Sequence, residues 1–225
     1  MVKKLFNNLI VVGQGYVGLP LAVNAAKSGY KVYGFDISKE KIEELKSGIT
    51  NSPEITKNEL LDLQKQKRIE FTMTIPSLSE KSIFVIAVPT PLNTERKPDL
   101  YMLNSACKLI ASVMVDQSLV INESTSYIGT LRNLIKPTIE TISLAKNISY
   151  AVAPERIDPG NIKWGMHNTP RIISGLDDFS TRQAVNFYSD FAGQIHTVSK
   201  PEVAEAAKLF ENTFRQFNIA LVNEL

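Results

Sequence analysis

A glycine-rich segment near the N-terminus constrains the fold of this chain more than any other feature. The residues Gly13-Gln14-Gly15-Tyr16-Val17-Gly18 follow an apolar run at 9–12 and precede a segment with helical spacing. Asp36 follows Gly18 at close to the 20-residue spacing typical of a ribose-binding carboxylate. The glycine pattern alone is weak evidence. Strand, glycines, helix and carboxylate in this order indicate a dinucleotide-binding loop.

Each position of this loop has a physical role in that interpretation. Gly13 permits a tight turn, Gly15 lets the backbone approach a pyrophosphate, and Gly18 lets the helix pack against the sheet. The helix N-terminus offers free N–H groups to the phosphates. Asp36 would bind the ribose hydroxyls and repel a 2′-phosphate, which favours NAD over NADP, although Lys39 and Lys41 lie nearby. The alternative is that the glycines only form turns. The cofactor contacts expected here are Gly13, Gly15, Tyr16, Val17, Gly18, Asp36 and Lys41.

Apolar runs and helical patterns alternate along the rest of the chain, which predicts an α/β fold with a doubly wound parallel, Rossmann-like sheet. Residues 1–200 are expected to form this domain, and 201–225 the start of a long helix. The stretch 157–170 has no clear period and is expected to be a long loop. Strands are expected near 9–12, 31–36, 83–88, 119–121, 150–152, 171–173 and 195–198, and helices near 19–26, 38–46, 56–61, 103–114, 131–142 and 182–191.

Composition excludes several functional classes. The net charge is +2 and there is no long basic run, so a nucleic-acid surface is not expected. No stretch has the apolar length of a membrane span. The single cysteine, Cys107, allows neither an intrachain disulfide nor a cysteine-based zinc site, and no metal is expected. These features suit a reducing cytoplasm.

The segment 201–225 differs from the rest. Pro201 suits the first turn of a helix, no helix breaker follows, and the sequence stops at Leu225 without a cap. We therefore expect a helix that belongs to a longer protein, with a naturally frayed end as the alternative.

Five segments resemble the UDP-glucose/GDP-mannose dehydrogenase family, in family order and over nearly the whole chain. One departure is Ile128, where the family usually has proline. The form Pro-Glu-Arg-Ile-Asp-Pro-Gly-Asn resembles the branch that acts on UDP-N-acetylhexosamines for bacterial surface polysaccharides. The five segments are 15–22 (GYVGLPLA), 88–91 (VPTP), 123–130 (ESTSYIGT), 153–161 (APERIDPGN) and 205–213 (EAAKLFENT).

The resemblance implies an NAD-dependent oxidation of the C6 alcohol of a UDP-sugar to a carboxylate, with two NAD used in succession. A cysteine thiolate traps the aldehyde, and the resulting thioester is hydrolysed. Cys107 lies in a helical pattern without a matching motif, so a buried, inert thiol is expected. The family's nucleophile and its second domain would lie beyond Leu225, so this chain is expected to bind NAD without completing the oxidation. The central helix implies a homodimer.

The resemblance also implies roles for individual residues. Lys208 and Asn212 would stabilise the oxyanion, although four-residue spacing alone fits a solvated helix face. Glu155 would position the hydrolytic water or hold substrate, or else only pair with Arg156. Thr125 would place that water or the nicotinamide ribose, or cap a helix. Further cofactor contacts are expected from Thr90, Pro91, Ser124 and Thr125, and substrate contacts from Glu155, Arg156, Lys208, Asn212 and Arg215.

Two alternatives remain open from the sequence. The chain could belong to another dehydrogenase of similar architecture, of the hydroxyacyl-CoA or 6-phosphogluconate type. It could also be a non-catalytic NAD-binding module, which the missing nucleophile supports.

Overall fold

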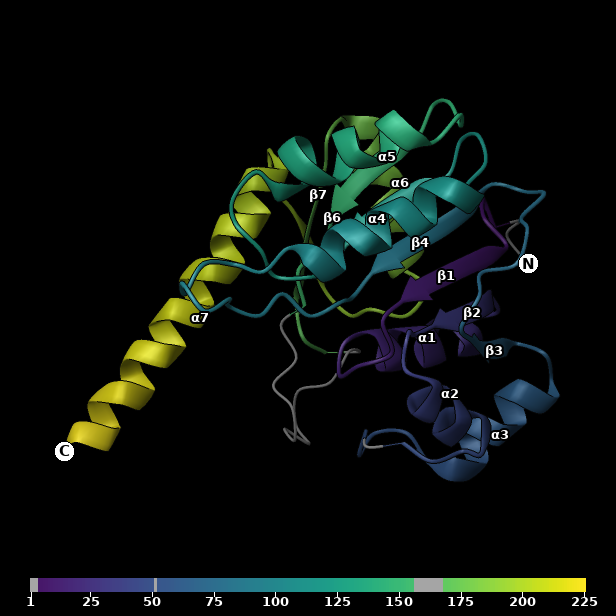
Figure 1. The fold of residues 1–225 in the computed structure, drawn as a ribbon, viewed down its shortest axis with the longest axis horizontal. Coiled ribbons are helices and arrows are strands. Elements are labelled where there is room, and N and C mark those ends of the chain that lie inside the picture. The colour runs from purple at the N-terminus through teal and green to yellow at the C-terminus, as the bar shows by residue number, and fades with distance from the viewer. Residues whose placement is uncertain (1–3, 51, 156–167) are drawn as a thin grey trace.

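An eight-stranded sheet with helices on both faces forms the body of the protein (Figure 1). The computed structural model describes residues 4–50, 52–155 and 168–225. The strands lie in the order β3-β2-β1-β4-β5-β6-β7-β8. They are β1 (Asn8–Val12), β2 (Lys31–Phe35), β3 (Ile69–Thr72), β4 (Ser82–Ile86), β5 (Leu119–Asn122), β6 (Ser149–Val152), β7 (Arg171–Gly175) and β8 (Ile195–Thr197).

Alternate residues of the central strands supply two separate cores. In β1, Leu9 and Val11 pack into one core while Ile10 and Val12 pack into the other, as expected of a strand that is buried on both faces. The first core includes α1 (Gly18–Lys27), α2 (Lys39–Lys46), α3 (Lys57–Lys65) and α6 (Asp178–Tyr188). The second includes α4 (Tyr101–Val113), η1 (Leu131–Ile135), α5 (Lys136–Ile142) and the start of α7 (Pro201–Glu224).

The strand order reverses direction between β1 and β4. The chain moves outward from β1 to β2 and β3, then returns to β4 on the other side of β1. In open α/β sheets, such a switch point leaves a crevice at the carboxyl ends of the strands, where ligands bind. The predicted doubly wound fold is confirmed, and the glycine loop after β1 lies at this crevice.

Side-chain caps mark the starts of the helices expected near 38–46 and 56–61. The Ser38 hydroxyl accepts from the Lys41 N–H, and Thr56 and Glu59 form a reciprocal capping box at the start of α3. Gly29 and Gly48 follow helices with φ of +95° and +78°, the left-handed conformation that ends helices.

Strand β3 was not predicted from the sequence. It contains only four residues, at the edge of the sheet, and its burial alternates along Ile69, Glu70 and Phe71. The Phe71 ring packs so closely on β2 that a Cβ at Gly34 would lie 2.8 Å from it. The alternation was the available signal, but it was brief and followed a strongly polar stretch.

The sheet departs from the expected parallel arrangement in one pairing. Strand β7 runs antiparallel to β6, with Ala151 opposite Gly175, while the other described pairs of strands are parallel. The helix expected at 131–142 begins as a π-helical turn, η1, before it continues as α5. Most of the loop expected at 157–170 lies outside the described residues, as does Arg156, which precedes it.

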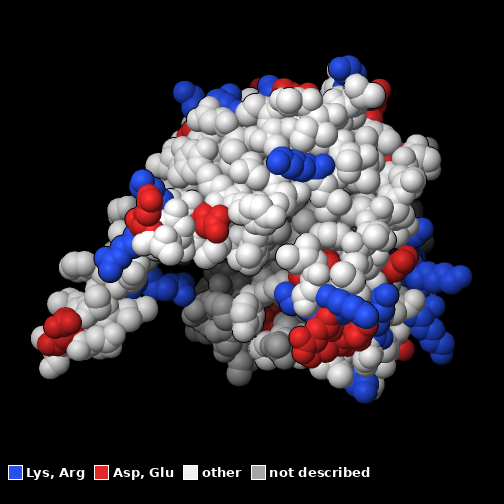
Figure 2. All heavy atoms as spheres, viewed as in Figure 1, with Lys and Arg blue, Asp and Glu red and all other residues white. Residues whose placement is uncertain are grey.

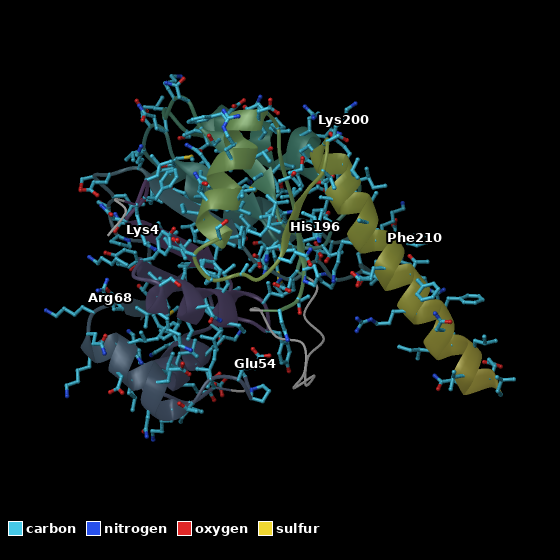
Figure 3. The ribbon with its side chains drawn as sticks, turned by 180° about the vertical axis from the view of Figure 1, so that it is seen from behind. Lys4, Glu54, Arg68, His196, Lys200 and Phe210 are labelled. Atoms are coloured by element: carbon cyan, nitrogen blue, oxygen red, sulfur yellow. The ribbon has the colours of Figure 1, made fainter. Side chains whose placement is uncertain are left out.

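Helix α7 begins on the sheet body and then leaves it. Its first turns contact β6 and β7, and its C-terminal half projects away from the domain (Figure 1). Figure 3 shows Phe210 on this projecting part. Within the described residues, no helix is both long and apolar enough to cross a membrane.

Candidate active site

The glycine loop has the geometry that the sequence predicts for a phosphate-binding turn. Gly13 has φ of +98°, and a Cβ there would lie 2.5 Å from the Ala87 carbonyl oxygen. A Cβ at Gly18 would lie 1.8 Å from the carbonyl oxygen of Gly13. At Gly15, no atom lies within 4 Å of a Cβ position. Gly13 and Gly18 are therefore required by the fold, whereas Gly15 leaves open space beside the backbone.

Asp36 is fixed at the end of β2 by backbone and side-chain partners. Its Oδ2 accepts from the Gln14 N–H at 2.9 Å and from Lys41 Nζ at 3.1 Å, and its Oδ1 accepts from the Ser38 N–H at 3.0 Å. The carboxylate thus orients the glycine loop as well as facing the crevice. The side chain of Gln14, which was not among the predicted cofactor contacts, donates to the Val11 carbonyl at 2.9 Å.

A cavity of about 400 Å³ lies at the carboxyl edge of the sheet and joins the segments that the sequence singled out. It is lined by the glycine loop, the ends of β2, β4 and β5, the segment after β6, and α7. Gly15 contributes to its wall, so a side chain there would project toward the space that a dinucleotide needs. The lining residues are Gly13, Gly15, Tyr16, Val17, Asp36, Lys41, Ala87, Val88, Pro89, Thr90, Glu123, Ser124, Thr125, Glu155, Lys208 and Asn212.

Hydrogen bonds connect the loops after β4 and β5. The Thr90 hydroxyl donates to the carbonyl of Thr125, and the Ser124 hydroxyl donates to the Val88 carbonyl at 2.8 Å. Asn122 secures the turn through bonds with the backbone of Ser124. These contacts hold Thr90 and Thr125 together on the cavity wall.

Three of the residues expected to act on substrate meet at the end of the cavity opposite Asp36. Glu155 follows β6, while Lys208 and Asn212 lie on α7. Arg215 and Pro91 do not line this cavity, and Arg156 lies outside the described residues. A carboxylate, an ammonium and an amide thus converge from two distant parts of the chain.

Behind Glu155 lies a buried cluster of charged groups that the sequence analysis did not predict. Arg171 donates from Nη1 to Glu123 Oε1 and from Nη2 to Glu155 Oε2, each at 2.5 Å, and also to the carbonyl of Ala153 at 3.2 Å. The Tyr188 hydroxyl donates to the same oxygen of Glu123 at 2.5 Å. The guanidinium carbon lies 4.5 Å from the centre of the Tyr188 ring.

The antiparallel direction of β7 explains how this cluster forms. Glu123 directly follows β5 and Glu155 follows β6, so both lie at the carboxyl edge of the sheet. Because β7 runs the other way, its first residue, Arg171, reaches the same edge. The available sequence signal was an arginine at the start of an otherwise apolar strand.

Burial changes the protonation behaviour of the cluster. Burial raises the pKa of Glu123 to about 7, although Arg171 and the Tyr188 hydrogen bond favour its charged form. Burial works against the charge on Arg171, yet the two carboxylates keep its pKa above the ordinary value. Burial and the Glu123 carboxylate raise the pKa of Tyr188, which therefore stays a neutral donor.

Glu205 fixes the start of α7 against the loop that carries Thr125. Its buried carboxylate accepts from the Gly129 N–H at 2.5 Å and from the Leu131 N–H at 3.0 Å. Burial raises the pKa of Glu205, while these two donors oppose the shift. Glu202 adds a more exposed ion pair with Arg132 at 2.7 Å. Glu205, Lys208 and Asn212 follow at helical spacing, so this anchor directs the other two side chains to the cavity.

Cys107 is buried within α4, in the second core. Burial raises the pKa of its thiol to about 12. A thiol that stays protonated and enclosed is a poor nucleophile, which agrees with the inert role expected from its sequence context.

Comparison with known proteins agrees with this geometry. Residues 7–192 match the model of the UDP-glucose/GDP-mannose dehydrogenase family, NAD binding domain. The chain belongs to this family. The family match argues against the alternative of a hydroxyacyl-CoA or 6-phosphogluconate type of dehydrogenase. The cofactor that this family's domain binds is NAD.

Relatives within the family include proteins that act on UDP-N-acetylhexosamines. A UDP-N-acetyl-D-glucosamine 6-dehydrogenase from Salmonella typhi is 39% identical over 96% of this chain and 51% of its own length. Protein CapL from Staphylococcus aureus is 37% identical over 97% of this chain and 51% of its own length. The solved structure of UDP-D-ManNAc dehydrogenase from Pyrococcus horikoshii is 36% identical, with a TM-score of 0.87 over 96% of this chain and 52% of that chain. This family member therefore spans about half the length of the curated relatives it matches.

Proposed function

We propose that this chain is the NAD-binding half of an NAD-dependent UDP-N-acetylhexosamine 6-dehydrogenase. Residues 1–200 would form the cofactor domain, and 201–225 the first part of a helix that leads to a sugar-nucleotide domain and to a homodimer interface. The observation that carries the proposal is the convergence of Thr125, Glu155, Lys208 and Asn212 on the cavity end opposite Asp36. The printed names of the relatives support the substrate class.

The cavity residues fit an NAD molecule laid from Asp36 to Glu155. Asp36 would bind the adenosine ribose, with Lys41 beside it, and the turn at Gly13, Gly15 and Gly18 would hold the pyrophosphate. Bound NAD supplies the hydride acceptor. Thr90, Ser124 and Thr125 would form the wall beside the nicotinamide end.

The remaining polar groups suit an oxidation at a sugar alcohol. The Lys208 ammonium and the Asn212 amide would stabilise negative charge that develops on the C6 oxygen. Glu155 would accept a proton or hydrogen bond from water, and Thr125 would help to position that water. Arg156 and Arg215 are proposed to contact the sugar nucleotide, and Pro91 to shape the cofactor wall. The product would serve surface polysaccharide synthesis.

The test is an assay of NADH formation by the full-length protein with UDP-N-acetylglucosamine, UDP-N-acetylmannosamine and UDP-glucose. Lys208→Ala is expected to lower kcat roughly 100- to 1000-fold, because a positioned donor to an oxyanion is lost. Glu140→Gln, on the distant α5, serves as a control and should leave kcat unchanged. If NAD binds but none of these sugars is oxidised, the chain is instead a non-catalytic NAD-binding module.

A further inference from the structure

The buried cluster of Glu123, Glu155, Arg171 and Tyr188 contributes two residues, Glu123 and Glu155, to the cavity wall at one defined end. Asp36 and Lys41 mark the ribose end of the cavity, and Gly15 the pyrophosphate position. Glu123 and Glu155 line the other end, where the nicotinamide ring of a bound dinucleotide would lie. The cluster therefore lies at the end of the cavity that would hold the nicotinamide ring. The charge of this ring changes in the reaction, because the oxidised ring is positively charged and the reduced ring is neutral.

The cluster holds two carboxylates and one guanidinium. Arg171 shares its two terminal nitrogens between Glu123 and Glu155, so it cannot neutralise both. The side chain of Glu123 is fully buried, and its Oε2 makes no hydrogen bond to any described residue. A carboxylate in such a place is screened little by water, so its charge acts over a longer range than a surface charge.

We propose that Glu123 sets the preference of this cavity for oxidised NAD over NADH, as an electrostatic specificity residue that does not touch the cofactor. The inference rests on the proposed NAD binding and deepens it. A negative charge behind the ring stabilises its cationic form and has little effect on its neutral form. Product NADH is thereby released more readily than NAD.

Other charged and titratable groups lie around Glu123. Arg171 faces it from β7, Tyr188 from α6 and Glu155 from the segment after β6, while Lys208 lines the same cavity from α7. The cations Arg171 and Lys208 offset part of the negative potential that the carboxylates create at the ring. They do not change the sign of the effect when the Glu123 charge is removed.

The same argument predicts a pH dependence. With the pKa of Glu123 raised by burial to about 7, the carboxyl is neutral below this value and charged above it. The ratio of the dissociation constant of NADH to that of NAD should therefore rise as the pH rises through about 7. The Tyr188 hydroxyl stabilises the charged form, so its removal should move the midpoint to higher pH.

The experiment is a calorimetric titration of this chain with NAD and with NADH at a series of pH values, which extends about one and a half pH units on either side of pH 7. Glu123→Gln is expected to lower the ratio of dissociation constants roughly three- to tenfold at the higher pH and to abolish its pH dependence. Tyr188→Phe retains the carboxylate, so it should keep the high-pH ratio and shift only the midpoint upward. Asp190→Asn, which removes a carboxylate paired with Lys4 and Tyr30 at a distance from the cavity, should leave the ratio unchanged.

The inference would be overturned if Glu123→Gln weakened the binding of NAD and of NADH equally. It would also be overturned if the ratio of the two dissociation constants of the wild-type chain did not vary with pH. Both outcomes would leave NAD binding in place. If Glu123→Gln does not fold, the midpoint shift in Tyr188→Phe decides the matter alone. If the wild-type chain binds neither cofactor, the proposed function is contradicted, and this inference with it.

Discussion

At the scale of single residues, the three loop glycines meet different physical demands. Gly13 combines a positive φ with a carbonyl oxygen 2.5 Å from any added Cβ, whereas Gly15 has open space. The sequence motif alone predicted all three positions, since glycine is the residue that tolerates such geometry. It did not predict Glu123, because the importance of that carboxylate depends on Arg171 and Tyr188, which lie far along the chain.

Substitution of two of these glycines should separate stability from binding. Gly13→Ala is expected to lower the free energy of unfolding by about 1 to 3 kcal/mol, through backbone strain and the clash with Ala87. Gly15→Ala should change stability by less than about 1 kcal/mol but weaken NAD binding at least roughly tenfold, because its methyl group occupies the approach of the pyrophosphate. Urea unfolding and NAD titration of both variants measure these effects. Similar losses of stability in the two variants would contradict the assignment.

At the scale of elements, local sequence signals predicted where helices start and end. They did not predict how distant elements contact one another. The helices expected near 38–46 and 56–61 do start at Ser38 and Thr56, because capping depends on residues within one turn. The antiparallel direction of β7 could not be predicted, since it depends on how the chain returns to the sheet rather than on the residues Arg171 to Gly175 themselves. The anchor of α7 at Glu205 is likewise a contact between distant segments.

Two acidic residues at the start of α7, Glu202 and Glu205, allow a matched pair of substitutions that tests this anchor. Glu205→Ala leaves the buried N–H groups of Gly129 and Leu131 without acceptors and should destabilise the chain by about 1 to 3 kcal/mol. Glu202→Ala breaks a half-exposed ion pair with Arg132 and should cost less than about 1 kcal/mol. Thermal and urea unfolding of both variants give the comparison. A larger loss from Glu202→Ala would show that the buried carboxylate does not anchor the helix.

At the scale of the whole molecule, charge and apolar surface are distributed unevenly. Figure 2 shows charged side chains of both signs gathered at the lower right of the visible face, while broad areas of the rest of this face are uncharged. The projecting half of α7 exposes large apolar side chains, with Phe210 75% exposed and Phe217 66% exposed. Pro201 and the lack of a later helix breaker predicted a helix there, but only the three-dimensional arrangement shows that its apolar residues leave the body of the domain (Figures 1 and 3).

This exposed surface predicts self-association of the chain. The apolar side chains on the C-terminal half of α7 are expected to pair between copies, because an exposed patch of this kind favours burial. Sedimentation velocity should show a concentration-dependent increase in mass. The triple change Phe210→Ser, Phe214→Ser and Phe217→Ser should return the chain to a monomer, with Phe179→Ser as an exposed aromatic control outside α7. A wild-type chain that stays monomeric at high concentration would contradict the prediction.

The central claim is that the crevice between β1 and β4 binds NAD through Asp36 and the glycine loop. Its most direct test is isothermal titration of this chain with NAD and with NADP, alongside Asp36→Ala and the control Glu140→Gln. We expect NAD to bind in preference to NADP, and Asp36→Ala to weaken NAD binding roughly tenfold while Glu140→Gln does not change it. A folded wild-type chain that binds neither dinucleotide, or binds NAD equally well without Asp36, would contradict the account.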